Sequence, residues 1–355
     1  MRISLLVLLG VLLAFPAGDR QRLAAATPAC TTPTAPCAEW VVFGAGPARS
    51  MIYRTHSLDA RNEGIRRALV MVHGTNRNAN DYFSTAAAAA FLAGALDDTV
   101  VIAPRFTGCD DTLQPNEVGW SCNGDSWRSG GMAATNPELS SFDFMDEIVR
   151  KVAKKSVFPN LRNVVVTGHS AGGQFVTRYE MSNRVHDSVG VAVSYVVANP
   201  SSYVWPAATR ALPVDDAAPA NAKEGWNTET PHTKFSYGPF EASACPNFNR
   251  WPLGLQDRTS GYTAKMTDEQ LLRQLVSRPT TYLLGQVDTL PLGGFDSSCQ
   301  AMAQGATRRA RGEAFVKYVN EQLGAKHTIQ IVPECGHNNR CVFTTDTVLP
   351  VIFPK

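Results

Sequence analysis

The sequence predicts an α/β fold with a mostly parallel central sheet flanked by helices. Short apolar runs alternate with helix-like segments along most of the chain, and this alternation is typical of a parallel sheet that is covered on both faces. One buried strand, at 163–167, leads directly into a glycine-rich turn and a helix. The length of 355 residues and the hydrophobic content of 44% suit one large domain, which we place at 27–355.

The elements follow from the apolar periodicity of each segment. The expected strands are 40–43, 51–53, 67–72, 100–103, 163–167, 191–197, 282–285 and 328–332. The expected helices are 80–96, 141–155, 173–185 and 307–323. The segment 199–280 breaks the alternation, because it is rich in Pro, Ser, Thr and aromatic residues and shows no long periodic element before about Asp268. We interpret it as an insertion over one edge of the sheet.

The first 26 residues predict an export signal and leader. Arg2 precedes an apolar run at 3–15, and Pro16-Ala17-Gly18 follows. The run is shorter than the roughly 20 residues that a transmembrane helix needs, and its order is that of a signal peptide. Cleavage near Gly18 and cleavage after the alanines 24–26 both stay open, and a retained anchor helix is the alternative. We expect a mature protein without a membrane span, secreted or periplasmic.

The cysteines support export, because exported chains meet oxidising conditions. A pairing of neighbours is one of many possible pairings. It would join Cys30 to Cys37, Cys109 to Cys122, Cys245 to Cys299 and Cys335 to Cys341. Zinc binding is the alternative, but the chain has no C-x-x-C and no H-E-x-x-H pattern, so we expect no metal. The net charge of +2 favours no particular partner, and no basic run has the interleaved aromatics that nucleic-acid binding requires.

Three side chains follow predicted strands, at the ends where open α/β sheets carry their chemistry. Ser170 lies in a G-x-S-x-G turn after 163–167, Asp288 follows 282–285, and His337 follows 328–332. A serine hydroxyl is a poor nucleophile until a base takes its proton; an imidazole can take it, and a carboxylate fixes the tautomer of that imidazole. We therefore predict Ser170 as nucleophile, His337 as base and Asp288 as the orienting acid. Asp296 is the rival acid, and His327, which looks exposed, is the rival base.

An oxyanion needs N–H donors near the nucleophile. The N–H of Ala171, directly after the serine, is one expected donor, and the backbone at Thr75 is the other. His73 is expected to hold the Thr75 loop through hydrogen bonds, and His169 is given no chemical role.

These motifs, in the chain order Ser170, Asp288, His337, resemble the α/β-hydrolase superfamily in its secreted carboxylesterase and lipase-like branch. The resemblance runs from about Arg67 to the C-terminus, the insertion excepted. It implies an α/β-hydrolase fold with the insertion over the active-site end, no cofactor, and hydrolysis of a carboxylic ester through an acyl-enzyme intermediate. Thr75 and Asn76 stand where the lipase pattern His-Gly-Gly-Gly has glycines.

The substrate class stays open between a small ester and a polymeric one. Polyester depolymerisation, amide or peptide hydrolysis, and a non-catalytic binding role are the alternatives, and the oligomeric state is not predicted. Four aromatic residues are expected to line the pocket, with simple packing as the alternative: Trp120, Trp127, Tyr203 and Trp205. Three arginines on the helix at 307–323 are interpreted as a solvated face: Arg308, Arg309 and Arg311.

Overall fold

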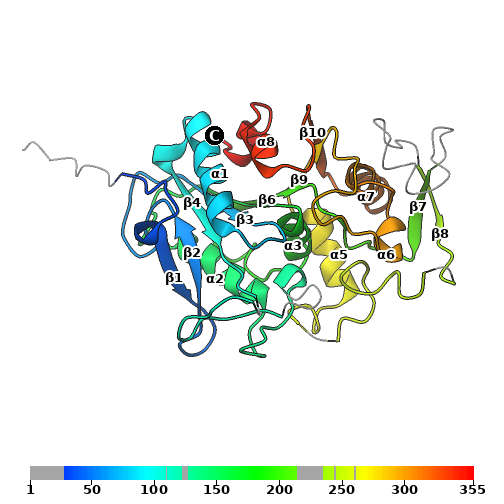
Figure 1. The fold of residues 1–355 in the computed structure, drawn as a ribbon, viewed down its shortest axis with the longest axis horizontal. Helices are drawn as coiled ribbons and strands as arrows, with labels where there is room; N and C mark the ends of the chain where they lie inside the picture. The colour runs from blue at the N-terminus through cyan, green and yellow to red at the C-terminus, as the bar shows by residue number, and fades with distance from the viewer. Residues whose placement is uncertain (1–27, 109, 122–126, 214–234, 244, 260) are drawn as a thin grey trace, which may run out of the picture.

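A computed structural model describes residues 28–355 apart from 109, 122–126, 214–234, 244 and 260. The expected export signal and the expected Cys109–Cys122 pair lie outside the described residues. Within the described part, eight strands form one sheet in the order β1-β2-β4-β3-β5-β6-β9-β10 (Figure 1). Their bounds are β1 Ala38–Val42, β2 Arg49–Arg54, β3 Arg67–Val72, β4 Thr99–Pro104, β5 Asn163–His169, β6 Ala192–Ala198, β9 Thr280–Gly285 and β10 Thr328–Val332.

The predicted mostly parallel sheet is confirmed. β4, β3, β5, β6, β9 and β10 run parallel to their neighbours, whereas β1 pairs with β2, and β2 with β4, in antiparallel fashion. The carboxyl ends of the six parallel strands therefore meet at one edge of the sheet, where open α/β sheets place their ligands.

Helices cover both faces of the sheet. The 3-10 helices are Ala35–Cys37, Leu96–Asp98 and Trp127–Ser129, and the α-helices are α1 Ala79–Leu92, α2 Ser141–Ala153, α3 Ala171–Glu180, α5 Asp268–Ser277, α6 Cys299–Met302, α7 Arg308–Leu323, α8 Asn339–Thr344 and α9 Leu349–Ile352. On β3, Leu69 and Met71 belong to the core cluster that includes residues of α1, α8 and α9, while Val70 and Val72 belong to the cluster that includes residues of α2, α3 and α7. Figure 1 shows α1 beside α8 above the sheet.

Several predicted helix ends differ from the structure, and α1 and α3 show the largest differences. α1 stops at Leu92, not at 96, because Gly94 takes the left-handed conformation at φ 62° and turns the chain. α3 begins two residues earlier than predicted and ends at Glu180, where the Ser182 hydroxyl donates to the Arg178 carbonyl and closes the last turn. The apolar periodicity that predicted these helices does not show where a glycine or a serine hydroxyl ends them.

The insertion packs on the molecule in three places. Its first residues stay at the carboxyl end of β6, where Asn199 donates from its backbone to the Leu283 carbonyl. Its hairpin, β7 Thr209–Pro213 with β8 Phe235–Pro239, lies against α7, as Figure 1 shows. Its later part bonds to the segment after β4, through the Trp251 indole to the Ser129 carbonyl at 3.2 Å.

Three of the four expected cysteine pairs are present as disulfides. Cys30–Cys37, Cys245–Cys299 and Cys335–Cys341 have Cα–Cα distances of 5.5, 5.7 and 5.7 Å. The second of these joins the insertion to the start of α6. Of the helices that the structure describes, none has the length and apolar character needed to cross a membrane.

Candidate active site

Ser170 occupies the turn between β5 and α3 with φ 59° and ψ −119°, a conformation that residues other than glycine rarely adopt. The turn is tight because three backbone segments meet there. A Cβ added at Gly168 would lie 2.5 Å from Gly172, one at Gly172 would lie 2.3 Å from the Val72 carbonyl, and one at Gly173 would lie 2.5 Å from the Ala198 carbonyl. Glycine at these positions is therefore what allows the serine to stand at the end of the sheet.

The three predicted side chains form one hydrogen-bonded chain. His337 Nε2 lies 2.9 Å from Ser170 Oγ, and His337 Nδ1 lies 2.8 Å from Asp288 Oδ2. The carboxylate can only accept, so Nδ1 carries the proton and Nε2 offers its lone pair to the serine hydroxyl. The Asp288 and His337 side chains are 1% and 9% exposed, so water competes little for these bonds.

The two rival residues lie elsewhere. Asp296 accepts from the Ser298 backbone at 3.1 Å, in the turn before α6. His327 is buried, not exposed as expected, and its Nε2 donates to the Leu275 carbonyl at 2.8 Å. Neither takes part in the two hydrogen bonds that join Ser170, His337 and Asp288, the residues that follow the three strand ends.

The loop after β3 lies against the turn that carries Ser170. His73 donates from Nδ1 to the Gly74 carbonyl at 2.9 Å and accepts the Phe106 N–H at Nε2, at 3.1 Å. Complete burial lowers the pKa of His73 to about 4, so the imidazole stays neutral and keeps both bonds. A Cβ added at Gly74 would lie 3.9 Å from the His169 carbonyl. His73 thus holds this loop as expected, while the oxyanion roles of Thr75 and Ala171 stay predictions.

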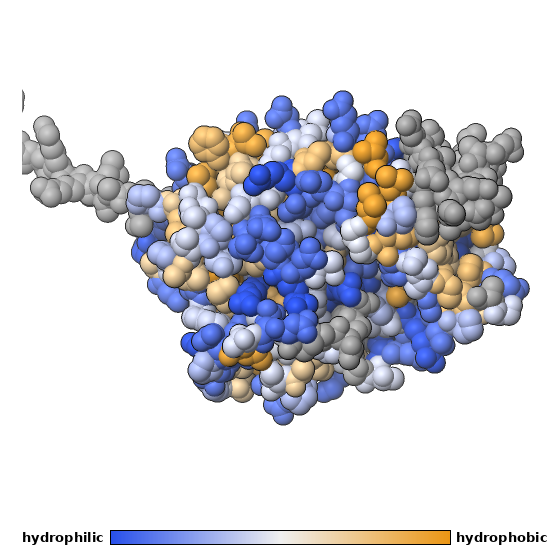
Figure 2. All heavy atoms as spheres, in the orientation of Figure 1, coloured by the Kyte–Doolittle hydropathy of each residue, from blue (hydrophilic) through white to orange (hydrophobic). Residues whose placement is uncertain are grey.

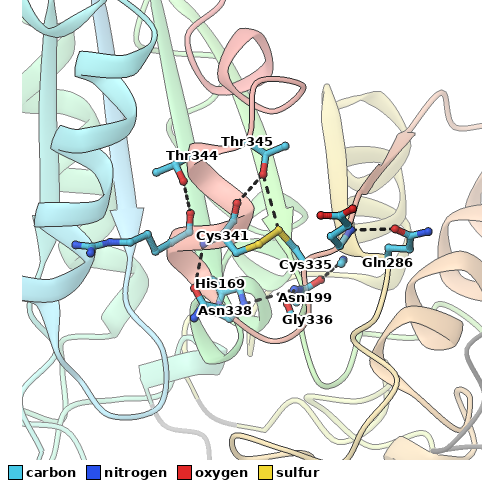
Figure 3. Close-up of a disulfide and its surroundings, with 12 residues drawn as sticks. His169, Asn199, Gln286, Cys335, Gly336, Asn338, Cys341, Thr344 and Thr345 are labelled. Atoms are coloured by element: carbon cyan, nitrogen blue, oxygen red, sulfur yellow. Dashed lines mark hydrogen bonds between the residues drawn. A yellow bond between two sulfur atoms is a disulfide. The ribbon is translucent and has the colours of Figure 1, made fainter.

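A second imidazole packs on the predicted base. The ring of His169 lies 4.5 Å from the ring of His337, and its Nδ1 is 3.3 Å from the Tyr82 hydroxyl. Burial lowers the pKa of His169 well below its ordinary value, so it adds no positive charge beside His337. Asn199 joins the end of β9 to the segment after β10. Its Oδ1 accepts from the Gly285 N–H at 2.8 Å. Its Nδ2 donates to the Gly336 carbonyl at 3.4 Å (Figure 3).

The expectation that four aromatic residues line the pocket needs correction. Trp120, Tyr203 and Trp205 are at most 1% exposed, and Trp127 is 6% exposed. All four belong to the larger core cluster, where Tyr203 stacks on Phe315 at 4.6 Å and Trp127 stacks on Phe106 at 5.2 Å. The loops that carry them fold down onto the sheet and its helices, so their rings pack inward and leave no face on an open cleft.

The interpretation of the α7 arginines as a solvated face is wrong for two of them. Arg308 and Arg311 are 1% and 0% exposed, and Arg308 Nη1 lies 3.4 Å from Asp288 Oδ1. The spacing of residues along the helix could have predicted this burial. Positions 308, 311, 315 and 319 fall on one helix face, and the last two are the apolar Phe315 and Val319. A charge on an apolar face indicates a buried charge with a partner.

Sequence reasoning also missed the segment between β9 and α6. It exposes the apolar side chains of Val287, Leu290 and Leu292, at 46%, 43% and 59%. It borders the predicted base, since a Cβ added at Gly293 would lie 2.9 Å from Cδ2 of His337. Figure 2 shows apolar surface in the region where Figure 1 places this segment. The run Leu290-Pro-Leu-Gly-Gly-Phe was the available signal.

A separate cavity of about 1620 Å³ lies between α2 and α5 and is lined among others by Glu147, Tyr262 and Gln270. The lining contains none of Ser170, Asp288 and His337, so we do not relate it to their chemistry. Among the residues that the structure describes, no group of three or more His, Cys, Asp or Glu side chains is arranged to hold a metal ion.

The sheet, the tight serine turn and the hydrogen-bonded chain define a hydrolase of the α/β class. The model of the alpha/beta hydrolase family matches residues 69–348, so the chain belongs to the α/β-hydrolase family. No curated protein matches the chain.

Solved structures show the same fold. Poly(aspartic acid) hydrolase-1 from Sphingomonas sp. KT-1 is 21% identical with a TM-score of 0.58, over 89% of this chain and 98% of that one. LpqC, a poly(3-hydroxybutyrate) depolymerase from Bordetella parapertussis, is 20% identical with a TM-score of 0.54, over 86% of this chain and 84% of that one. At these identities the likeness concerns the fold.

Proposed function

We propose that this protein is an exported serine hydrolase that cleaves carboxylic esters. The observation that carries the proposal is the position of His337, which lies 2.9 Å from Ser170 Oγ and 2.8 Å from Asp288 Oδ2. One imidazole in this place can take a proton from the serine while the carboxylate stabilises the charge that it acquires.

The reaction proceeds in two halves. Ser170 Oγ attacks the acyl carbonyl as its proton passes to His337 Nε2; the bond from the acyl carbon to the alcohol oxygen then breaks, and the alcohol leaves with that proton. A water next attacks the acyl-enzyme, again giving a proton to His337. The proton returns to Ser170 as the ester bond to Oγ breaks, which frees the acid and restores the enzyme.

The backbone N–H groups of Ala171 and Thr75 are the proposed donors to the tetrahedral oxyanion. Ala171 is the first residue of α3, where backbone N–H groups have no partner within the helix and carry the positive end of its dipole. Support for Thr75 comes from the packing of its loop: a Cβ added at Gly172 would lie 2.7 Å from the His73 carbonyl.

A polyester depolymerase is the second candidate within the ester class. It is favoured by the apolar side chains of Val287, Leu290 and Leu292, which are exposed on the segment beside His337. A solid polymer presents an apolar surface that such side chains can contact. The name of LpqC agrees with this substrate class, whereas the name of poly(aspartic acid) hydrolase-1 agrees with amide hydrolysis. The three disulfides and the predicted leader support export.

Ser170→Ala tests the proposal. We expect wild type to react with a fluorophosphonate probe at Ser170, and the variant to lose labelling and roughly 10⁴- to 10⁶-fold of ester turnover, because members of such a triad act as a unit. Ser182→Ala is the control, since it removes another buried serine hydroxyl, at the end of α3. This variant should keep both the probe labelling and the ester turnover. Labelling that survives Ser170→Ala would sink the assignment.

The substrate class is tested with the same preparations. A panel of p-nitrophenyl esters of increasing acyl length, a polyester film and a peptide amide are offered to wild type and to Ser170→Ala. Release of soluble acid from the film by wild type alone supports the depolymerase. Turnover of the amide with no ester turnover would contradict the proposed ester chemistry.

A further inference from the structure

We propose that Arg308 is a positioning residue of this site, whose guanidinium fixes both the Asp288 carboxylate and the segment that borders the His337 ring. The inference rests on the proposed function, because it assigns Arg308 a role in the geometry of Ser170, His337 and Asp288. Arg308 touches none of the reacting atoms.

The guanidinium of Arg308 bonds to two segments, the one after β6 and the one between β9 and α6. Nε donates to Ser201 Oγ at 2.8 Å, Nη1 lies 3.4 Å from Asp288 Oδ1, and Nη2 donates to the carbonyls of Leu292 and Gly293 at 2.6 and 3.0 Å. The side chain is 0% exposed. A planar fork with donors in fixed directions suits this set of acceptors, and no flexible ammonium could reach all of them together.

The carboxylate of Asp288 is held at both of its oxygens. Oδ2 accepts from His337 Nδ1 at 2.8 Å, and Oδ1 faces Arg308. A carboxylate with one bonded oxygen can rotate about its last bond, whereas one that is held at both oxygens keeps its plane. The direction of the Asp288–His337 bond therefore depends on Arg308.

The same guanidinium also holds the backbone segment that packs beside the His337 imidazole. Gly293, whose carbonyl accepts from Arg308, has φ 57° and its backbone lies so close to His337 that a Cβ would come within 2.9 Å of Cδ2. Leu292, whose carbonyl is also held, is 59% exposed and belongs to neither core cluster of the described residues. Release of the two carbonyls should loosen this segment and widen the space around the ring.

Arg308 also changes the charge balance at His337. The titratable and charged groups that face His337 or its partner are Asp288 after β9, His169 at the end of β5, and Arg308 on α7. His169 is kept neutral by burial. The Arg308 cation offsets part of the Asp288 charge and so disfavours the imidazolium. Removal of the cation should therefore favour imidazolium, and activity that needs neutral His337 should begin at a higher pH.

Arg311 provides a matched control. It lies one turn further along α7 and is equally buried, but it bonds to the Ser201 and Gly305 carbonyls and the sulfur of Met302. Both guanidinium groups also lie over the Phe295 ring, at 4.4 Å for Arg311 and 5.2 Å for Arg308. Removal of either guanidinium takes one charge from the same helix face. Arg308 contacts the acid and the Gly293 carbonyl directly, whereas the hydrogen bonds of Arg311 go to other residues.

The experiment compares Arg308→Lys, Arg308→Met and Arg311→Met with wild type. It measures kcat and KM on a short-chain ester, the pH profile of fluorophosphonate labelling at Ser170, and hydrogen exchange of the backbone at 290–294. For Arg308→Met we expect roughly a 100-fold loss of kcat with KM changed less than about threefold, since misplacement of a base by about 1 Å has such an effect. The acid limb of its labelling profile should move to higher pH, because the cation beside the Asp288 carboxylate is gone.

Arg308→Lys keeps the positive charge but loses the planar set of N–H donors of the guanidinium. We expect its acid limb to stay within about 0.3 pH units of wild type and its kcat to recover roughly tenfold over Arg308→Met, while residues 290–294 exchange faster than in wild type. If Arg308→Met does not fold, this variant carries the test. Exchange at 290–294 that equals wild type overturns the inference, and so does an Arg311→Met variant with the same loss of kcat and the same shift. Failure of the proposed function looks different: wild type would not be labelled at Ser170, whereas exchange would still report the contacts of Arg308.

Discussion

Two neighbouring segments bring the acid and the base to Ser170, and they are held in different ways. The base segment follows β10 and is closed covalently, because a disulfide joins Cys335 to Cys341 (Figure 3). His337 lies between these two cysteines in the sequence. The acid segment follows β9, is longer, and is held by hydrogen bonds and an ion pair from Arg308 on α7.

The difference reflects what each segment has to satisfy. The base segment leads at once into α8, whose first turn is capped by Asn338, so a short covalent ring is enough to fix it to a helix. Side chains of the acid segment, such as those of Leu290 and Leu292, are exposed before α6. The carbonyls of Leu292 and Gly293 face inward, to the buried Arg308 guanidinium. Buried carbonyls need donors, and a single guanidinium supplies several. We therefore expect the two segments to respond to different changes. The base segment should respond to loss of the Cys335–Cys341 disulfide, and the acid segment to loss of a charge or to an added side-chain atom.

Asp288→Asn should give the largest effect in the acid segment. The amide oxygen can still accept from Arg308, so the fold should persist, but the imidazole loses the partner that fixes its tautomer. We expect kcat to fall by roughly 10³- to 10⁴-fold, with a small change in Tm. Asp296→Asn is the control, because that carboxylate serves the turn before α6. A larger loss for Asp296→Asn than for Asp288→Asn would show that the acid has been misassigned.

Gly293→Ala tests the same segment by adding a methyl group instead of removing a charge. The added methyl group would lie 2.9 Å from His337 Cδ2, closer than such contacts allow, so the ring or the segment must move. We expect kcat to fall by roughly 10- to 100-fold, since catalysis is sensitive to small displacements of a base. Gly294→Ala has the same backbone strain, with φ 70° against 57°, but its nearest neighbour is Thr75 Cγ2 at 3.4 Å. Equal losses in both variants would attribute the effect to strain alone.

The sequence predicts most of what depends on local pattern. The bounds of β3 and the two-sided burial of the sheet follow from apolar runs, and the order of strand ends brought Ser170, Asp288 and His337 to one edge. The glycines around the serine are required by close backbone approach, which the turn pattern already implies.

What the sequence does not show are the long-range partners of polar groups and rings. Arg308 meets an aspartate 20 residues away and a serine 107 residues away, so its burial depends on three segments coming together. Tyr203 and Trp205 read as loop aromatics, yet α7 covers them. The helix ends differ for a local reason: Gly94 takes a left-handed conformation after α1, and the Ser182 hydroxyl donates to the Arg178 carbonyl at the end of α3.

The Cys335–Cys341 disulfide should give the smallest effect on rate and distinguishes a local role from a general one. In the chain-entropy model a ring this short stabilises the fold by roughly 2 kcal/mol, so replacement of both cysteines by alanine should lower Tm by a few degrees. The base segment keeps the bond from Asn199 to the Gly336 carbonyl and the Asn338 cap, so we expect kcat to fall only about three- to tenfold. The Cys30–Cys37 pair is the matched control, because it closes a ring of similar size, with a sequence separation of 7 against 6, and one of its cysteines is also fully buried. Its double alanine variant should lose a similar amount of thermal stability and keep kcat. Equal kcat in the two double variants, measured on one ester at a temperature well below both transitions, would contradict a role of the Cys335–Cys341 ring in holding His337.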